Sequence, residues 1–183
     1  DCDSTQFCRV VVFDAGKCHK REFLRIFAKN RLRSYQTLQQ NHKHMKQTDL
    51  ARLAKEDIIS IIGKEWMLIT AGDIQHFNTM TASWGGVGFL WGKPVAFVFI
   101  RPERYTHDFV EQNDRLTLTF FDEADKDILN FCGTKSGRDY DKVKETGLRP
   151  VATPGGNVSF EQARLTIEGR KLYKTRLTAD GFI

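Results

Sequence analysis

The segment Pro94-Val-Ala-Phe-Val-Phe-Ile100 is the most apolar strand-like stretch of this 183-residue chain. An apolar run of this length, without helical spacing, is typical of a β-strand that is covered on both faces. The polar sequence Arg101-Pro-Glu-Arg104 follows it directly and predicts the end of the strand. We therefore place Pro94–Ile100 in a β core and interpret the other segments outward from it.

Short apolar segments on both sides of this run carry strand or helix patterns. The predicted strands are Trp66–Ala71, Thr79–Trp84, Pro94–Ile100, Leu116–Phe121 and a long strand or hairpin over Ala163–Leu177. The predicted helices are Asp49–Ile62, Tyr105–Gln112, Lys126–Phe131 and Asp139–Glu145. Because strands and helices do not alternate strictly, we expect a mainly β fold: a closed or sandwich-like core with short helices on its rim.

The net charge of +5 is confined to the first quarter of the chain. Residues 1–44 carry nine Lys and Arg against four Asp and Glu, whereas residues 45–183 are balanced. We therefore predict a basic N-terminal extension, 1–44, and one domain, 45–183. The extension is either a basic arm for nucleic acid or an anionic membrane, or a segment outside the native domain. We expect the second, with neither nucleic acid nor membrane as a partner, because the pattern from Met45 onward is orderly without it.

Cysteine usage favours a reduced compartment. Cys132 is the single cysteine after residue 44, so no disulfide can form within the predicted domain and we expect a cytoplasmic protein. Cys2, Cys8, Cys18 and His19 invite a zinc interpretation but lack paired Cys-x2-Cys spacing, and we predict no metal site.

Familiar catalytic motifs are missing from the sequence. Gly133-Thr-Lys-Ser136 resembles a phosphate loop superficially, but the first glycine and the Gly-Lys pair of the nucleoside triphosphatase motif are absent. No nucleophile and base can be paired, so we name no catalytic residue. This favours an organic cofactor as the source of reactivity.

Small and hydroxyl-bearing residues follow one another at the end of a predicted strand. They are Asn78, Thr79, Met80, Thr81, Ala82, Ser83 and Trp84, with Gly85 and Gly86 after them. Such a segment leaves backbone N–H groups and hydroxyls open to a flat polar ligand. It is also compatible with an ordinary strand and hairpin turn.

Two arginines and a hydroxyl lie directly after the apolar strand. Arg101, Arg104, Tyr105 and Thr106 occupy the junction with the helix predicted to begin at Tyr105. Guanidinium groups beside a helix N-terminus suit phosphate oxygens. The alternative is a solvated loop in which Arg104 pairs with Glu103 or Asp108.

A third polar cluster contains Lys135 and Ser136 in the sequence Gly133-Thr-Lys-Ser-Gly-Arg-Asp-Tyr-Asp-Lys142. As a lysine-bearing loop between two short helices, it can contact a phosphate or close over a ligand. The alternative is an exposed connection between helices.

These motifs, taken in order, resemble the flavin reductase-like family and, within it, the bacterial flavoredoxin-type branch. The resemblance is carried by Trp66–Asp73, Asn78–Gly85, Lys93–Phe97, Arg101–Thr106 and Gly133–Asp139, and it extends over about residues 46–183. It implies an FMN-binding split barrel, a Greek-key β-barrel that usually forms a homodimer with its flavin sites near the subunit interface.

The resemblance also implies a role for each cluster. The Thr79–Trp84 segment would face the isoalloxazine edge and ribityl chain of FMN, Arg101, Arg104 and Thr106 the phosphate, and Lys135 and Ser136 the closing loop. NAD(P)H would be the hydride donor, and a redox partner or free flavin the electron acceptor. The alternatives are an FMN electron carrier without its own NAD(P)H step and a flavin-free binding protein.

Two departures from the family pattern accompany the resemblance. The family's ordered region normally continues some tens of residues past the equivalent of Ile183, so we expect a C-terminally shortened domain. His107 stands where an aromatic residue such as tyrosine is expected.

Overall fold

The computed structural model describes residues 8–20, 46–48 and 56–177. Its strands are β1 (Cys8–Lys20), β2 (Lys46–Thr48), β3 (Met67–Gly72), β4 (Phe77–Ala82), β5 (Gly85–Leu90), β6 (Lys93–Ile100), β7 (Arg115–Phe120), β8 (Pro150–Ala152), β9 (Val158–Phe160) and β10 (Leu165–Leu177). Its helices are α1 (Ile58–Ser60), the π-helical turn η3 (Ile61–Glu65), α2 (Tyr105–Gln112), the 3-10 turn η4 (Glu123–Asp125), α3 (Lys126–Thr134) and α4 (Lys142–Thr146). The mainly β fold predicted from the sequence is confirmed.

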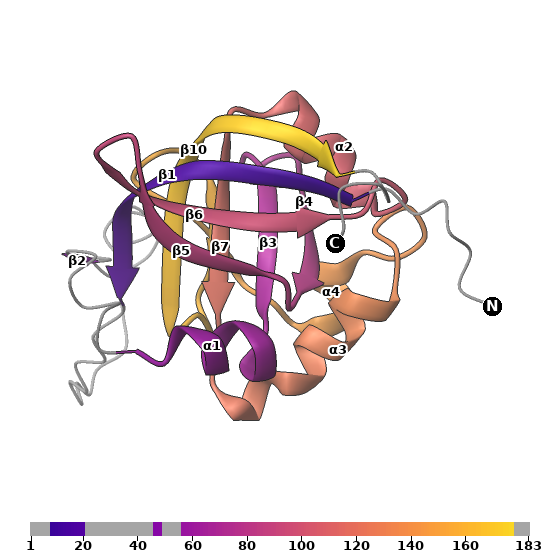
Figure 1. The fold of residues 1–183 in the computed structure, drawn as a ribbon. Coiled ribbons are helices and arrows are strands. Elements are labelled where there is room, and N and C mark those ends of the chain that lie inside the picture. Colours follow the sequence, from indigo (N-terminus) through magenta and orange to yellow (C-terminus); the bar gives the residue numbers. More distant parts are fainter. Residues whose placement is uncertain (1–7, 21–45, 49–55, 178–183) are drawn as a thin grey trace, which may run out of the picture.

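One antiparallel sheet forms most of the molecule, in the order β4-β3-β7-β10-β1-β6-β5, with β2 paired to β1. Strands β1, β6 and β10 bend and cross over β3, β4 and β7 (Figure 1). Irregularities in the β1–β10 pairing, between Val12 and Phe13 and between Asp14 and Lys17, explain the bend, since bulges increase the twist of a strand.

The two edges of this sheet are consecutive in sequence. Strand β4 ends at Ala82, β5 begins at Gly85, and the intervening Trp84 accepts a hydrogen bond from the backbone N–H of Phe99 in β6 at 3.4 Å. The sheet is therefore curled into a barrel that remains open between β4 and β5. This opening, with Ser83 and Trp84 at its end, is the split of the barrel.

Strand β1 corrects the predicted division of the chain. It lies between β10 and β6, pairs with β6 from Arg9 to Asp14, and buries Val11 and Ala15 in the same core as β6. The expectation that residues 1–44 form an extension is therefore wrong for Cys8–Lys20. The basic stretch over residues 21–44 and Cys2 lie outside the described residues.

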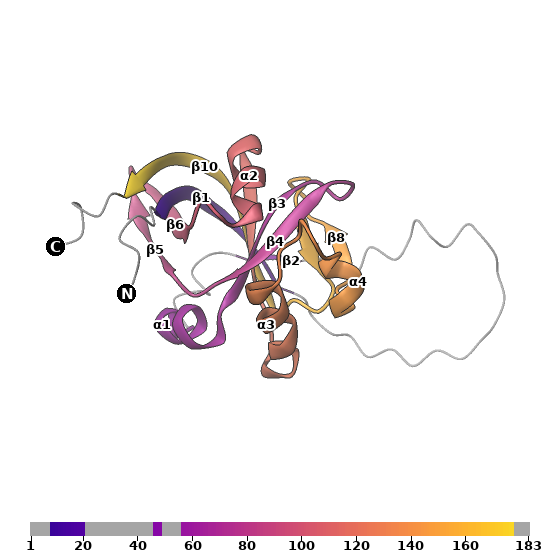
Figure 2. The same cartoon turned by 90° about the vertical axis from the view of Figure 1, so that its right-hand side faces the viewer.

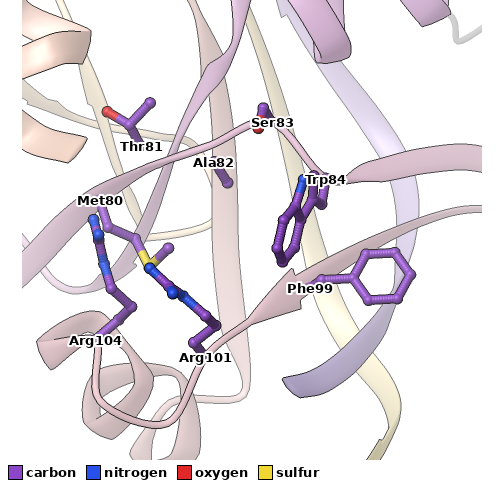
Figure 3. A pocket seen from close by; sticks show the side chains of 8 residues that line it. All are labelled: Met80, Thr81, Ala82, Ser83, Trp84, Phe99, Arg101 and Arg104. Atoms are coloured by element: carbon purple, nitrogen blue, oxygen red, sulfur yellow. The ribbon is translucent and has the colours of Figure 1, made fainter. Parts of the chain in front are cut away.

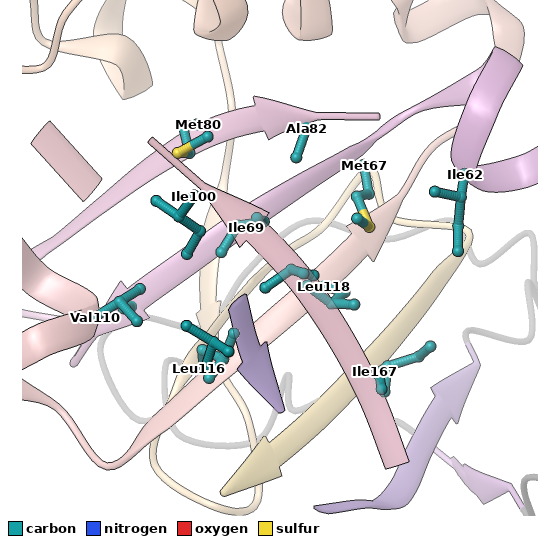
Figure 4. Packing of buried hydrophobic residues seen from close by; sticks show 14 of the residues in the cluster. Ile62, Met67, Ile69, Met80, Ala82, Ile100, Val110, Leu116, Leu118 and Ile167 are labelled. Carbon is teal, nitrogen blue, oxygen red and sulfur yellow. The ribbon is translucent and has the colours of Figure 1, made fainter. Parts of the chain in front are cut away.

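The barrel interior is filled by alternate residues of its strands. Met67, Ile69 and Ala71 of β3 point inward with Leu116 and Leu118 of β7 (Figure 4), and all are nearly inaccessible to solvent. Alternation follows from the two-residue period of a strand. Burial of each large aliphatic side chain contributes roughly 1.5–3 kcal/mol.

A second apolar cluster covers the outside of β3. Leu68 packs there with Leu129 and Cys132 of α3 and with Val158 and Phe160 of β9. Helix α4 and the strand β8 lie on this side of β3 and β4, away from β5 (Figure 2). Strand β3 is thus buried on both faces.

Several predicted element boundaries differ from the structure. Strand β6 buries Ala96, Val98 and Ile100 on one face, whereas on the other face Val95 is buried and Phe97 and Phe99 are only half-buried. The expected burial on both faces is therefore wrong for the second half of this strand. The helix predicted over Asp49–Ile62 is, from residue 56 onward, the short α1 followed by the turn η3. Helix α2 has the predicted bounds, Tyr105–Gln112.

Candidate functional site

A cavity of about 210 Å³ opens at the split of the barrel. It is lined by Met80, Thr81, Ala82, Ser83, Trp84, Phe99, Arg101 and Arg104. The two guanidinium groups extend from the loop after β6 toward the strand that carries Met80 (Figure 3). We call this the wide cavity.

A narrower cavity of about 90 Å³ adjoins it. Its lining residues are Asn78, Met80, Glu103, Arg104, Tyr105, Thr106, Thr134, Lys135, Ser136, Gly137 and Lys142. Met80 and Arg104 line both cavities. The two spaces are therefore neighbours on either side of Met80 and Arg104, and together they define a candidate site between the split of the barrel and the N-terminus of α2.

Most residues predicted for the site line one of these cavities. The wide cavity gathers Met80, Thr81, Ala82, Ser83, Trp84, Arg101 and Arg104. The narrow cavity adds Asn78, Tyr105, Thr106, Lys135 and Ser136. The three sequence clusters, which are separated by some tens of residues along the chain, thus meet in space.

Thr79 lines neither cavity. Its hydroxyl lies 2.9 Å from that of Thr70 on β3 and donates to the backbone oxygen of Ile69 at 3.3 Å. Successive side chains of a strand point to opposite faces, so β4 cannot present six consecutive side chains to one ligand. Thr81 is two residues further along β4 than Thr79, so its side chain points to the same face of the strand. Its hydroxyl donates to the backbone oxygen of Leu129 at 2.5 Å.

Asn78 and Thr106 connect β4 to the start of α2. The Asn78 side-chain amide donates to the Thr106 hydroxyl at 2.8 Å, and both side chains are buried. No side chain caps the N-terminus of α2. The first N–H groups of a helix have no partner within it, and they contribute positive potential to the narrow cavity.

Arg104 holds helix α3 against this N-terminus. Its two terminal nitrogens donate to the backbone oxygens of Gly133 at 2.7 Å and Cys132 at 3.2 Å, near the end of α3, where carbonyl groups lack helical partners. Burial, and then the nearby Arg101, lower the pKa of Arg104 from its ordinary value. A guanidinium has five N–H groups, so Arg104 retains donors for a ligand.

Arg101 is more accessible than Arg104. Its side chain is 41% exposed, and Nε lies 3.5 Å from a carboxylate oxygen of Glu103. A partly solvated ion pair of this kind contributes little to stability. Arg101 can therefore turn toward a ligand in the wide cavity at small energetic cost.

The loop between α3 and α4 is fixed over the start of α2 by Arg138. Its guanidinium forms a 2.8 Å ion pair with Asp108 and lies 4.5 Å from the centre of the Tyr105 ring. Gly137 packs so closely on Asn78 that an added Cβ would overlap the amide oxygen. The loop bearing Lys135 and Ser136 thus forms one wall of the narrow cavity.

The structure adds lining residues to the set of site residues predicted from the sequence. These are Phe99, Glu103, Thr134, Gly137 and Lys142. Lys142 lies in the polar sequence Tyr140-Asp-Lys-Val-Lys-Glu145, which gives no signal of burial. Its ammonium nevertheless donates to the backbone oxygens of Thr79 at 2.7 Å and Cys132 at 3.0 Å.

The donor set suits a phosphate ester attached to a flat, partly polar group. Three cationic side chains, Arg104, Lys135 and Lys142, line the narrow cavity against one carboxylate, Glu103. Phosphate oxygens in proteins are usually bound by arginine guanidinium groups, lysine ammonium groups and the free N–H groups of a helix N-terminus. The wide cavity adds the apolar surfaces of Met80, Ala82 and Trp84. The residues present therefore fit a phosphorylated aromatic cofactor.

His107 lies beside this region without lining either cavity. Its Nδ1 is 3.6 Å from Asp108 and its Nε2 is 3.8 Å from Glu111, both on α2. The side chain is 12% exposed. The position at which His107 replaces the expected aromatic residue therefore does not line either cavity.

Within the part of the chain that the structure describes, no three His, Cys, Asp or Glu residues gather as a metal site. Among the same residues, no helix has the length and apolar character needed to cross a bilayer.

A comparison with protein families assigns the chain to a known class. The family described as "Flavin reductase like domain" matches residues 60–181. The chain belongs to the flavin reductase-like family. No curated protein matches its sequence.

A solved structure with a TM-score above 0.5 shares the fold of this chain. The FMN-binding domain of a flavin reductase-like enzyme from Shewanella baltica OS155 has a TM-score of 0.51 at 14% identity, over 64% of this chain and 71% of that one. The flavoredoxin of Desulfovibrio vulgaris (Miyazaki F) has a TM-score of 0.49 at 20% identity, over 60% of this chain and 68% of that one. At such identities the likeness concerns the fold alone.

Proposed function

We propose that this chain binds FMN across the two cavities and acts as an oxidoreductase that accepts a hydride equivalent from NAD(P)H. The observation that carries the proposal is the adjacency of the wide, partly apolar cavity and the narrow cationic one, which share the lining residues Met80 and Arg104. An aromatic ring system joined to a phosphate by a short chain requires such a pair of spaces. Membership of the flavin reductase-like family supports the same assignment.

The residues of the narrow cavity would hold the phosphate. Arg104 has N–H groups left after its two carbonyl contacts, and Lys135 and Ser136 approach from the loop opposite. The Thr106 hydroxyl accepts from Asn78 and keeps its own hydrogen for donation. These groups bind and orient the phosphate, and so fix the position of the attached ring.

The residues of the wide cavity would hold the ring. Met80 and Ala82 supply apolar contacts from β4, and Ser83 supplies a hydroxyl at the split. Trp84 is 59% exposed and lies at the mouth, where its indole can exclude water from one edge of a bound ring. Bound FMN supplies two-electron chemistry, accepting a hydride equivalent from a reduced nicotinamide and releasing electrons to an acceptor.

No acid or base in the wide cavity is needed to move a proton. Arg101 and Arg104 are its two ionisable lining residues, and arginine stays protonated at physiological pH. Their charge would stabilise the anionic form of the reduced ring. The contribution of this chain is thus binding, orientation and electrostatics.

We further propose a homodimer in the cytoplasm, in which a second copy covers the β5 edge. Strand β5 has a described neighbour, β6, on one side, and it carries the exposed Phe89 between Trp84 and Trp91. Large exposed aromatic side chains along an edge strand favour association. Sedimentation of the purified chain, with and without FMN, tests this assembly.

The function is tested by flavin loading followed by anaerobic reduction. Purified protein is mixed with excess FMN, freed of unbound flavin and examined for flavin absorption at about one per chain. The loaded protein is then mixed anaerobically with NADH or NADPH, and the bleaching of the flavin band is followed. Bleaching within seconds supports a reductase, whereas loading without bleaching indicates an electron carrier. Failure to load FMN would contradict the proposal.

A further inference from the structure

Lys142 is a buried cation at the base of the narrow cavity. Its side chain belongs to the first residue of α4 and the residue is 6% exposed. Through Thr79 and Cys132 its ammonium joins strand β4 to helix α3, at 2.7 Å and 3.0 Å respectively. The side chain thus reaches the layer of residues directly behind the predicted phosphate position.

The charge of Lys142 is not balanced by an acid. Both of its hydrogen-bond acceptors are neutral carbonyl groups, and no carboxylate among the described residues forms an ion pair with it. An ammonium has three N–H groups, so one remains without an acceptor in the part of the chain described here. Lysine is seldom buried unless it is paired, and the third N–H of Lys142 is therefore available to an anion from outside.

The cavity that Lys142 lines provides the place for that anion. Arg104 and Lys135 line the same narrow space, with Thr106 from the uncapped end of α2. We propose that Lys142 determines specificity for phosphorylated over unphosphorylated flavin, by donating its third N–H to the phosphate dianion. This inference rests on the proposed FMN-binding function.

The titratable groups around Lys142 allow the effect of pH to be derived. The pKa of Lys142 is lowered to about 8, and burial is the largest cause. Cys132 of α3 acts to raise this pKa, whereas Arg104 acts to lower it further. Burial raises the pKa of the Cys132 thiol to about 11, so it stays neutral while Lys142 titrates. Lys135 and Glu103 line the same cavity, and Asp141 precedes Lys142. As pH rises through about 8, loss of the Lys142 charge should weaken phosphate binding and leave the neutral ring unaffected.

The test compares FMN with riboflavin, which has the same ring and no phosphate. Dissociation constants are measured from flavin fluorescence quenching at pH 7 and low salt for the wild type, K142M and K144M. Lys144 is an exposed lysine on the same helix and is the matched control. We expect K142M to weaken FMN by about tenfold or more and riboflavin by less than about threefold, since one charge-assisted hydrogen bond is lost. K144M should change neither constant.

The wild type supplies a second measurement that does not depend on the folding of a variant. Between about pH 7 and pH 9 its preference for FMN over riboflavin should fall severalfold. Equal weakening of both flavins in K142M, or a preference that is constant with pH, would overturn the role of Lys142. A wild type that binds FMN in either of those cases leaves the proposed function intact. A wild type that binds neither flavin overturns both.

Discussion

The guanidinium of Arg104 donates a 2.7 Å hydrogen bond to the backbone oxygen of Gly133. This contact joins the loop after β6 to the C-terminal end of α3, two segments that carry different parts of the candidate site. A second hydrogen bond from the same guanidinium reaches the oxygen of Cys132, which also accepts from Lys142. Arg104 therefore both lines the cavities and holds their walls together.

Replacement of Arg104 should affect stability and binding together. R104A leaves two carbonyl groups of α3 without their donor, and we expect a loss of about 1–3 kcal/mol in the free energy of unfolding. FMN affinity should fall by at least about tenfold. Arg101 provides the comparison, because its side chain is 41% exposed and lies 3.5 Å from the carboxylate of Glu103. R101A should lower the affinity for FMN without a measurable change in urea unfolding. Equal stability of the two variants would contradict the structural role of Arg104.

Gly137 should tolerate no side chain. The Cβ of G137A would overlap the amide oxygen of Asn78, so either the loop or Asn78 must move and the Asn78–Thr106 hydrogen bond is strained. We expect FMN affinity to fall by about tenfold or more, with destabilisation of about 1–3 kcal/mol. Gly63 has open space around its Cα, and G63A is the control, expected to bind FMN normally. Wild-type affinity in G137A would show that this contact is not part of the binding wall.

Trp84 and Trp91 provide a matched pair of exposed indoles. They are 59% and 69% exposed, but only Trp84 lines the wide cavity among the described residues. W84A should weaken riboflavin and FMN alike by about 1 kcal/mol or more, because the lost contact is to the ring. W91A should weaken either flavin less than W84A does, because Trp91 lies on the proposed dimer edge and does not line the wide cavity. Isothermal titration with each flavin checks this, and equal effects of the two substitutions would argue against placement of the ring beside Trp84.

The stability of the flavin-free protein should depend on pH through Lys142. Its pKa is about 8 in the folded chain against 10.5 for an ordinary lysine, so the unfolded chain holds the extra proton between these values. The folded state is therefore disfavoured by this group below about pH 8 and regains stability as pH rises toward 10.5. Relative to K142M, the wild type should gain up to about 1 kcal/mol per pH unit in that window. Urea unfolding of both proteins at pH 7.5, 8.5 and 9.5 measures the difference. A constant difference would contradict this assignment.

The sequence by itself determined the strands β3, β4, β6, β7 and β10 and the residue types of the site, but it did not predict β1, β2, β5, β8 or β9. Apolar runs and two-residue alternation place Trp66–Ala71 and Leu116–Phe121 close to β3 and β7, because a strand buries its apolar positions wherever it pairs. The order of the five segments that carry the resemblance is enough to indicate the family. Helix α2 was predicted with its observed bounds, since Pro102 and the helix pattern after Arg104 are local signals.

Only the tertiary structure decided which groups face the site. Strand β1 belongs to the sheet because β6 and β10 bond to it, although its surrounding sequence is basic. The side chain of Thr79 points away from the two cavities and pairs with Thr70, whereas the ammonium of Lys142 donates to the backbone of β4. These outcomes depend on pairings between residues far apart in the chain, whose register and burial are fixed by packing and not by local sequence. Local preference selects strand or helix, but the hydrogen-bond partner of a buried polar group exists only once the distant segment that carries it has docked.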